Sequence, residues 1–349
     1  MVKKVFIAGG GTGGHFYPAL SVAKFLDKNG YEICYFGTKN GIESEKDFLG
    51  KKYLFDIKGV RGKGILNKPS SIYKLLKTAF KIKKIIKKEK PLFSICFGGY
   101  TSVPLGIASW LSGIDLYIHE QNSIPSYSNI LLSKFAKKIF ITFEYTKKYF
   151  PEEKTHLTGL PIRKSLLKRL SLTKEEARKI LNINAKEKVV LIFGGSQGAK
   201  KLNEICLKLA EKHKDVIFIN IQGKSKLGNI SKNIIAFDYF EDMGLLYKVS
   251  DLVICRAGAS TVNEILTFGK YAIFIPYPYA ASNHQYYNVK WLEEKNLCKV
   301  ITEENISQIY KEFENLLNID FSKFEDKIRE LSITDAEKRI YKELKNENI

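Results

Sequence analysis

An α/β protein with two doubly wound, Rossmann-like parallel sheets is predicted by three features of the sequence. Short apolar runs rich in Val, Ile and Phe alternate with amphipathic stretches of helical period, a pattern typical of parallel sheets covered by helices. Glycine-rich turns at residues 9–14 and 194–199 each follow an apolar run and lead into a helical pattern. The chain has 349 residues, which suits two hydrophobic cores better than one.

The apolar runs and helical patterns place the expected elements in order. In the first half we expect strands over residues 4–8, 32–36, 53–57, 92–97, 115–119, 138–141 and 155–157, with helices over 16–28, 71–88 and 103–111. In the second half we expect strands over 189–193, 216–219, 234–237, 252–255 and 272–275, with helices over 199–212, 261–268 and 285–294.

The expected domains are residues 1–160 and 164–330, joined near a Gly-Leu-Pro stretch at 159–161. Thr173 with Glu176, and Thr334 with Glu337, have the spacing of a capping box at a helix start. The last segment, 331–349, is then a helix that we expect to return to the first domain. Five scattered cysteines without a C-x-x-C pair are typical of reduced, packed thiols.

The first glycine turn has the features of an anion site. A strand that ends in glycines and turns into a helix presents backbone N–H groups at the positive end of the helix dipole. The second strand lacks the terminal acid of a dinucleotide site, and the Gly-Lys-Ser/Thr of a nucleotide P-loop is absent. The turn delivers Thr12 and His15 to the sheet edge, with His15 as a phosphate ligand or proton acceptor. A plain turn with a surface histidine is the alternative.

Three stretches of the second half carry further polar groups. Ser196, in the second glycine turn, can donate its hydroxyl to a diphosphate, although a purely structural turn is the alternative. Glu264 follows a third strand-to-helix turn and can either cap helix amides or accept two sugar hydroxyls. His284 and Gln285, at another helix start, are donors suited to a sugar. No Asp-x-Asp pair or cluster with metal spacing occurs, so helix dipoles, amides and cations must neutralise a diphosphate leaving group.

Positive charge is concentrated in one segment. The net charge is +20, and residues 61–90 contain eleven Lys or Arg with a single acid. On a helical wheel the apolar residues of 72–86 gather on one side, and lysines line the other. One reading is a helix packed on the sheet with solvated lysines. The other interpretation is that this segment contacts an anionic membrane. The contacting surface would then consist of the 63–68 loop together with Ile72, Tyr73, Lys74, Leu76, Lys77 and Lys81.

Taken together, these blocks resemble glycosyltransferase family 28, whose GT-B fold has two Rossmann-like domains facing a central cleft. The most specific matches are Gly-Gly-Thr-Gly-Gly-His at 10–15, His-Glu-Gln-Asn at 119–122 and Gly-Gly-Ser-Gln-Gly at 194–198. Others lie at 61–64, 98–100, 161–163, 242–243, 256–264 and 284–285, so the resemblance covers most of the chain.

The resemblance implies inverting transfer of GlcNAc from UDP-GlcNAc to the C4 hydroxyl of MurNAc in undecaprenyl-pyrophosphoryl-MurNAc-pentapeptide. This step belongs to peptidoglycan synthesis, on which cell-wall growth, cell shape and division depend. It further implies a peripheral enzyme on the cytoplasmic face of the cell membrane that needs no metal, cofactor or nucleic acid. No segment reaches the roughly 18 uncharged apolar residues of a spanning helix.

The resemblance also implies residue roles. His15 is the candidate base or acceptor-phosphate ligand. The implied donor-binding residues are Thr12, Gly13, Gly14 and Asn122 for GlcNAc and diphosphate, Arg163 and Ser196 for the diphosphate, Phe240 through its backbone for uracil, Ala259, Ser260, Thr261, Val262, Asn263 and Glu264 for phosphate and ribose, and His284 and Gln285 for the GlcNAc hydroxyls.

Two positions depart from the family pattern. Leu160 stands where an asparagine is usual, which leaves no asparagine side chain there, and Phe240 replaces a smaller aliphatic residue. Two other functions would account for part of the sequence. A GT-B enzyme with another substrate, such as a glycolipid synthase, does not usually carry both His-containing blocks. A basic nucleic-acid-binding protein explains the charge but not two phosphate turns.

Overall fold

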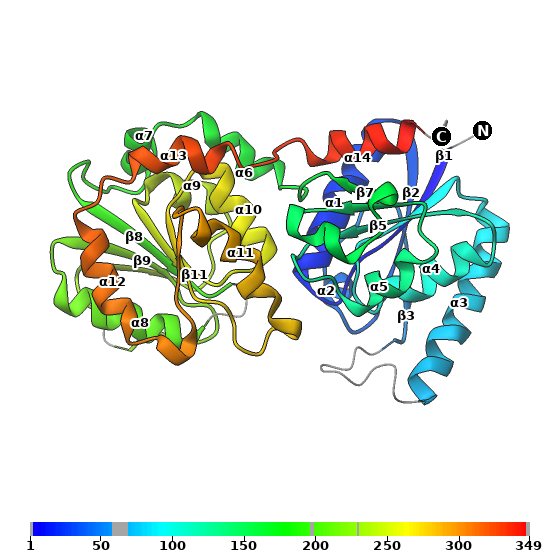
Figure 1. Ribbon diagram of the computed structural model, residues 1–349, viewed down its shortest axis with the longest axis horizontal. Coiled ribbons are helices and arrows are strands. Elements are labelled where there is room, and N and C mark those ends of the chain that lie inside the picture. The colour runs from blue at the N-terminus through cyan, green and yellow to red at the C-terminus, as the bar shows by residue number, and fades with distance from the viewer. Residues whose placement is uncertain (1–2, 58–68, 196–198, 229, 347–349) are drawn as a thin grey trace. The chain divides into compact units, whose positions relative to one another are not determined.

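Figure 1 shows the computed structural model, which describes residues 3–57, 69–195, 199–228 and 230–346. The chain divides into two compact units, residues 1–161 with 333–349 and residues 162–332. Each unit is built on one parallel sheet, so the predicted α/β class with two Rossmann-like sheets is confirmed. The 63–68 loop, the 61–64 block and Ser196 lie outside the described residues.

The first unit has a seven-stranded sheet in the order β3-β2-β1-β4-β5-β6-β7. Its strands are β1 Lys3–Ala8, β2 Tyr31–Thr38, β3 Lys51–Phe55, β4 Phe93–Cys96, β5 Asp115–Glu120, β6 Lys138–Ile141 and β7 Thr155–Leu157. Its α-helices are α1 Gly13–Lys28, α2 Ile42–Glu45, α3 Pro69–Glu89, α4 Ser102–Trp110, α5 Tyr127–Ser133 and α14 Ala336–Lys345.

Alternation along the strands sends side chains to two separate cores. Val5 and Ile7 of β1 join one core with buried residues of α1 and α14. Phe6 and Ala8 face the other core, with buried residues of α3, α4 and α5. Because successive side chains of a strand point to opposite faces, helices cover both faces of this sheet.

The second unit has a six-stranded sheet in the order β10-β9-β8-β11-β12-β13. Its strands are β8 Lys188–Phe193, β9 Val216–Ile221, β10 Ile234–Phe237, β11 Leu252–Cys255, β12 Ala272–Phe274 and β13 Lys299–Val300. Its α-helices are α6 Lys164–Lys168, α7 Lys174–Ile180, α8 Lys200–Lys212, α9 Met243–Val249, α10 Ala259–Phe268, α11 His284–Glu294, α12 Gln308–Leu317 and α13 Ser322–Arg329. All five cysteines of the chain are buried and free, as their spacing predicted.

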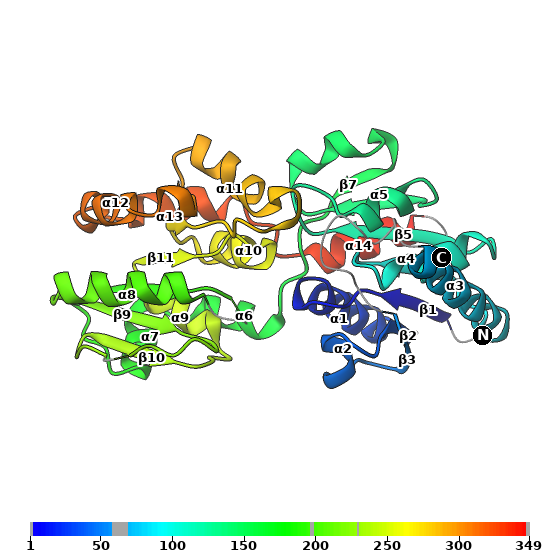
Figure 2. The same cartoon turned by 90° about the horizontal axis from the view of Figure 1, so that it is seen from below.

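The C-terminal helix α14 packs on the first unit beside α1, as both views show (Figure 1, Figure 2). Ile340 and Leu344 are 1% exposed within the core that α1 covers. On the other side, Glu343 accepts from Lys138 of β6 at 2.9 Å and lies 3.3 Å from Nδ1 of His156. Hydrophobic burial and an ion-pair network therefore both hold this helix.

One of the two predicted capping boxes is confirmed and one is wrong. Thr173 accepts from the Glu176 amide at 3.1 Å, and the Glu176 carboxylate accepts from the Thr173 amide at 2.8 Å. Helix α14 instead begins at Ala336, beyond the predicted cap at Thr334. The Glu337 carboxylate accepts a hydrogen bond from Ser21 of α1, so a tertiary contact takes the acid that the box required.

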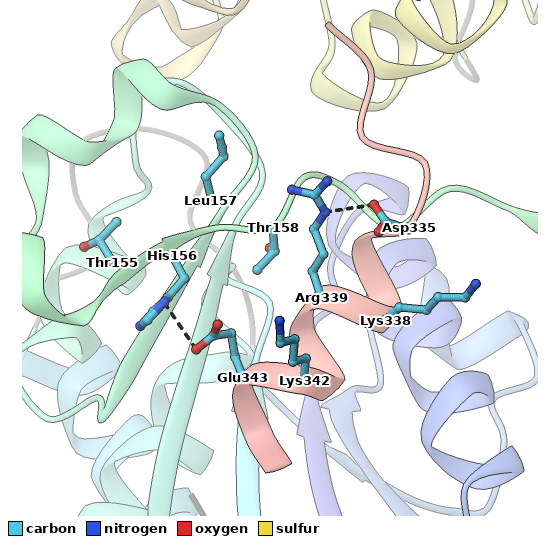
Figure 3. Close-up of a pocket in the computed structure, with 9 residues that line it drawn as sticks. All are labelled: Thr155, His156, Leu157, Thr158, Asp335, Lys338, Arg339, Lys342 and Glu343. Carbon is cyan, nitrogen blue, oxygen red and sulfur yellow. Dashed lines mark hydrogen bonds and ion pairs between the residues drawn. The ribbon is translucent and has the colours of Figure 1, made fainter. Parts of the chain in front are cut away.

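A cavity of about 560 Å³ lies between β7 and α14 (Figure 3). Its lining is Thr155, His156, Leu157, Thr158, Asp335, Lys338, Arg339, Lys342 and Glu343. One lining cation, Arg339, donates to the lining carboxylate of Asp335 at 2.8 Å, and the other lining carboxylate, Glu343, accepts from Lys138. None of the residues that the sequence assigned to a functional site lines this cavity.

Candidate functional site

The order of each sheet reverses direction beside its first strand, between β1 and β4 and between β8 and β11. In open parallel sheets, ligands bind at the carboxyl ends of the strands at such switch points. Both predicted glycine turns leave the sheets there, one after β1 and the other after β8.

A buried carboxylate, Glu43 of α2, shapes the first glycine turn. It accepts hydrogen bonds from the amides of Gly11 at 2.8 Å and Thr38 at 2.9 Å. The side chain is fully buried, and a Cβ on Gly10 would lie 2.2 Å from its Oε1. One amide of the predicted anion site is therefore already committed to an internal anion. Sequence reasoning missed Glu43, because no local pattern links it to a turn 32 residues away.

The first turn of α1 keeps the polar surface that the sequence predicted. Thr12 occupies the N-cap position in an extended conformation, and its carbonyl accepts the amides of His15 and Phe16 at 3.2 and 3.1 Å. Its side chain makes no cap hydrogen bond, and Thr12 and Gly14 are exposed. No acidic residue lies in this turn, so the positive end of the helix dipole is not neutralised by its own helix.

The His15 ring lies between a glycine pair and a buried amide. Its Nδ1 is 2.8 Å from Oε1 of Gln121, a residue 106 positions away at the end of β5. Gly98 and Gly99 follow β4 with φ of +81° and +74°. A Cβ on either residue would lie 3.2 to 3.3 Å from atoms of the imidazole. The glycine pair therefore allows the backbone to pass close to the ring.

Asn122 lies in a loop that Glu120 braces. The buried Glu120 carboxylate accepts from the amides of Asn122 and Ser126, both at 2.9 Å, and from Nδ2 of Asn129 at 2.8 Å. The carbonyl of Asn122 accepts from Thr146 at 3.1 Å. Asn122 itself is half-buried at the sheet edge that carries His15. Within the 119–122 block, Glu120 thus fixes the loop.

In the second unit, Glu264 and Arg163 lie side by side, although the resemblance implied separate roles for them. The Glu264 carboxylate accepts from the Tyr247 hydroxyl at 2.8 Å and lies 3.6 Å from Nη2 of Arg163. Burial raises the pKa of Glu264, against the opposing effects of Arg163 and Tyr247. These contacts replace the helix-capping alternative, because Glu264 lies in the second turn of α10 and its partners are side chains.

The first turn of α10 divides between surface and core. Ser260 and Thr261 are half-buried, whereas Ala259, Val262 and Asn263 are buried. The Asn263 side chain donates to the Ala259 carbonyl at 2.9 Å, so it serves the helix itself. Ligand contacts from the buried residues can therefore come only from their backbone.

Each of three further predicted residues, Phe240, His284 and Gln285, contacts a residue close to it in the sequence. The half-buried Phe240 ring lies 4.7 Å from the ring of Phe237. The His284 ring donates from Nδ1 to the Ala281 carbonyl at 2.8 Å. Oε1 of Gln285 accepts the Tyr277 amide at 2.9 Å, which directs its NH₂ group elsewhere.

Arg256 of a resembling block, and Leu160 beside another block, make contacts within the protein. Arg256 donates to the carbonyls of Ile275 and Pro276 at 3.1 and 3.2 Å and pairs with Glu303, so it braces the loop before α11. Leu160, where the family pattern has asparagine, is 1% exposed and packs in the interior.

Helix α3 divides its apolar residues between the core and the surface. Leu75, Ala79, Ile82 and Ile86 are 1 to 6% exposed, as the packing reading requires. Ile72, Tyr73, Leu76 and Phe80 are instead 37 to 64% exposed. At 100° per residue these four span about 100° of the helix between the core-facing side and the side of Lys74, Lys77 and Lys81. We call these four residues the exposed apolar strip.

Among residues 3–57, 69–195, 199–228 and 230–346, no three His, Cys, Asp or Glu side chains gather to hold a metal ion. Within the same ranges, no helix combines the length and apolarity needed to span a bilayer.

The family comparison agrees with both sheets and both glycine turns. The glycosyltransferase family 28 N-terminal domain matches residues 5–141, and the family's C-terminal domain matches residues 189–342. The chain therefore belongs to glycosyltransferase family 28.

Individual relatives indicate which enzymes of this family the chain is similar to. The chain is 53% identical, over 99% of both chains, to the UDP-N-acetylglucosamine–N-acetylmuramyl-(pentapeptide) pyrophosphoryl-undecaprenol N-acetylglucosamine transferase of Sulfurihydrogenibium sp. strain YO3AOP1. It is 40% identical to the enzyme of the same name from Aquifex aeolicus, over 97% of this chain and 99% of that one. The crystal structure of Acinetobacter baumannii MurG superposes with a TM-score of 0.81 at 31% identity, covering 99% of both chains.

Proposed function

We propose that this chain transfers GlcNAc from UDP-GlcNAc to the C4 hydroxyl of MurNAc on undecaprenyl-pyrophosphoryl-MurNAc-pentapeptide, with inversion at C1. The observation that carries this function is the 53% identity to a transferase of that name over 99% of both chains. The C4 oxygen bonds to C1 of GlcNAc, the bond from C1 to the β-phosphate oxygen breaks, and UDP leaves.

The proposed proton acceptor for this step is His15. Its imidazole lies at the carboxyl edge of the sheet and is half-buried, and its Nδ1 lies 2.8 Å from the neutral amide of Gln121. A positioned base of this kind contributes about 10²–10⁴-fold to the rate. The neighbouring residues Thr12, Gly13, Gly14 and Asn122 are proposed to contact the sugar and diphosphate.

The proposed donor site of the second unit is organised around Glu264 and Arg163. A half-buried guanidinium beside a buried carboxylate presents one group for a diphosphate and one for the two ribose hydroxyls. The start of α10, from Ala259 to Asn263, supplies amides at the positive end of a helix dipole. Ser196 is proposed for the diphosphate, the Phe240 backbone for uracil, and His284 and Gln285 for the GlcNAc hydroxyls.

We propose that Arg163 and helix amides neutralise the leaving diphosphate, without a metal or cofactor. A donor comparison tests the function: UDP-GlcNAc, UDP-GalNAc and UDP-glucose are each offered with the lipid-linked acceptor. We expect transfer from UDP-GlcNAc to exceed that from the other two. Preferred transfer from UDP-glucose, or tighter binding of DNA than of UDP-GlcNAc at matched salt, would contradict the proposal.

We also propose that α3 attaches the enzyme to the cytoplasmic face of the membrane that carries the acceptor. The exposed apolar strip lies beside Lys74, Lys77 and Lys81, the arrangement of a helix that inserts apolar groups among anionic headgroups. Each such lysine contributes about 1 kcal/mol at an anionic surface. Because α3 follows β3 and leads into β4, its first turns lie at the carboxyl edge of the sheet, where His15 also lies.

A further inference from the structure

A chain of three hydrogen bonds, one part-buried and two buried, connects His15 to residues that the proposed mechanism does not use. Nδ1 of His15 lies 2.8 Å from Oε1 of Gln121. Nε2 of Gln121 lies 3.2 Å from Nδ1 of His119, and Nε2 of His119 lies 2.9 Å from the carbonyl oxygen of Gly159. His119 and Gln121 are 0% and 2% exposed. The donor and the acceptor of each bond follow in turn, starting from the bond to the Gly159 carbonyl.

The Gly159 carbonyl fixes the proton on His119. A carbonyl oxygen only accepts, so Nε2 of His119 must carry the hydrogen. Burial is the main cause that lowers the pKa of His119 to about 4, so the ring is neutral at physiological pH. A neutral imidazole has one N–H, and Nδ1 of His119 is therefore an acceptor. The ring also stacks on Phe97, with centroids 5.4 Å apart, which holds its plane.

The acceptor on His119 fixes the orientation of the Gln121 amide. Only the NH₂ group of Gln121 can donate to Nδ1 of His119. The same NH₂ group donates to the backbone carbonyl of His119 at 3.1 Å, where the amide oxygen would be repelled. Two independent acceptors thus select one of the two amide orientations, and Oε1 must face His15.

Because Oε1 of Gln121 only accepts, Nδ1 of His15 must carry a hydrogen. We propose that Gln121 and His119 are positioning residues that hold neutral His15 in the Nδ1–H tautomer, leaving Nε2 as its proton acceptor. The inference rests on the proposed role of His15 as the base. Beyond that role, the inference states that Nε2 takes the proton and that Gln121 and His119 select this tautomer. Selection by the protein is needed because the neutral ring of histidine in water favours the Nε2–H form.

Nitrogen NMR of the full-length protein with ¹⁵N-labelled histidine tests the proposal directly. The chain has five histidines, and the spectrum of His15→Ala assigns the His15 signals by their loss. In the neutral imidazole ring of His15, we expect Nδ1 to be protonated and Nε2 to be bare. A protonated Nε2 on neutral His15 would overturn the proposal.

Gln121→Met keeps the length of the side chain and removes its three hydrogen bonds, to His15, to the His119 ring and to the His119 carbonyl. We expect the His15 equilibrium to move toward Nε2–H and turnover at saturating substrates to fall about 2- to 12-fold, the bias of one neutral hydrogen bond. The KM for UDP-GlcNAc should not change. Ile340→Ala, in the core of the same unit on α14, is the control for general destabilisation and should leave the tautomer as it is.

Two results separate this inference from the proposed function. An unchanged His15 tautomer in Gln121→Met would overturn the relay, even if His15 is the base. Normal turnover in His15→Ala would instead remove the base role, and the wild-type tautomer would still report on the relay. Should Gln121→Met not fold, the wild-type spectrum alone decides.

Discussion

Glu264 offers the most discriminating perturbation of the donor site, because binding and stability should respond in different ways. The side chain is 14% exposed and contacts Tyr247 and Arg163. Glu264→Gln keeps the shape and can still accept the Tyr247 hydrogen bond, but it removes the charge that the ribose hydroxyls and Arg163 would meet. Glu264→Ala removes the contact altogether.

Loss of charge-assisted hydrogen bonds to the ribose should cost about 1.5–3 kcal/mol, or about 10- to 100-fold in UDP affinity. We expect Glu264→Ala to reach this range and Glu264→Gln to fall within its lower part. Removing Glu264 also frees Arg163 from its 3.6 Å contact, so the two residues should be non-additive in a double-mutant cycle.

The stability of the wild type and that of Glu264→Gln should depend on pH in different ways. Burial raises the pKa of Glu264 above its ordinary value of 4.5, so the folded apoprotein binds this proton more tightly than the unfolded chain. Its contribution to stability is therefore greatest in acid and is lost as the pH rises from that ordinary value through the folded pKa. Glu264→Gln lacks this loss, so its melting temperature at neutral pH should equal or exceed that of the wild type.

Calorimetric titration with UDP and thermal melts from pH 4 to pH 8 supply both readouts. Glu176→Ala is the matched control, because Glu176 belongs to a capping box at α7 and should lower only the melting temperature. Unchanged UDP affinity in Glu264→Ala, with a lowered melting temperature, would refute the ribose assignment.

Three further outcomes are expected. His15→Ala should bind UDP-GlcNAc normally and lose about 10²–10⁴-fold in turnover; weak donor binding with near-normal saturated turnover would make His15 a donor ligand instead. Replacing Lys74, Lys77 and Lys81 by Glu should weaken binding to phosphatidylglycerol vesicles at least about 100-fold and leave UDP binding intact. The same change at the exposed residues Lys186, Lys208 and Lys311 should not weaken vesicle binding. Equal vesicle binding by the wild type and the first variant would mean that α3 only packs on the sheet. Ile340→Ala, in the core under α14, should lower the free energy of unfolding by about 2–5 kcal/mol in urea, and a loss below 0.5 kcal/mol would mean that α14 is not packed as described.

Local patterns predicted the elements well where an apolar run has clear ends. The strand at 138–141 and the strand at 155–157 match β6 and β7 in their bounds. Helix α1 begins at Gly13, three residues before the predicted start, because glycines carry no helix signal and the turn geometry starts the helix. The strand expected at 53–57 is β3 Lys51–Phe55, because pairing with β2 decides which residues join the sheet.

The residues of the site also divide into those that local sequence patterns predict and those that they do not. Glycine turns and polar strand ends can be read locally, and the 119–122 block was found in this way. The partners inside that block were not, since His15 meets Gln121 across 106 residues and His119 meets Gly159 across 40. Glu43 was missed for the same reason. Its one sequence signal is an acid two residues after Gly41, in the turn that follows the second strand, and this signal is weak alone.

The most direct test of the central claim is one transfer reaction with the purified full-length chain, UDP-GlcNAc and the lipid-linked MurNAc-pentapeptide in excess EDTA. We expect one UDP released for each GlcNAc added, a β linkage at C4 of MurNAc, and no loss of rate from the chelator. An α-linked product, transfer to another hydroxyl, or activity lost with EDTA and restored by magnesium or manganese would contradict it.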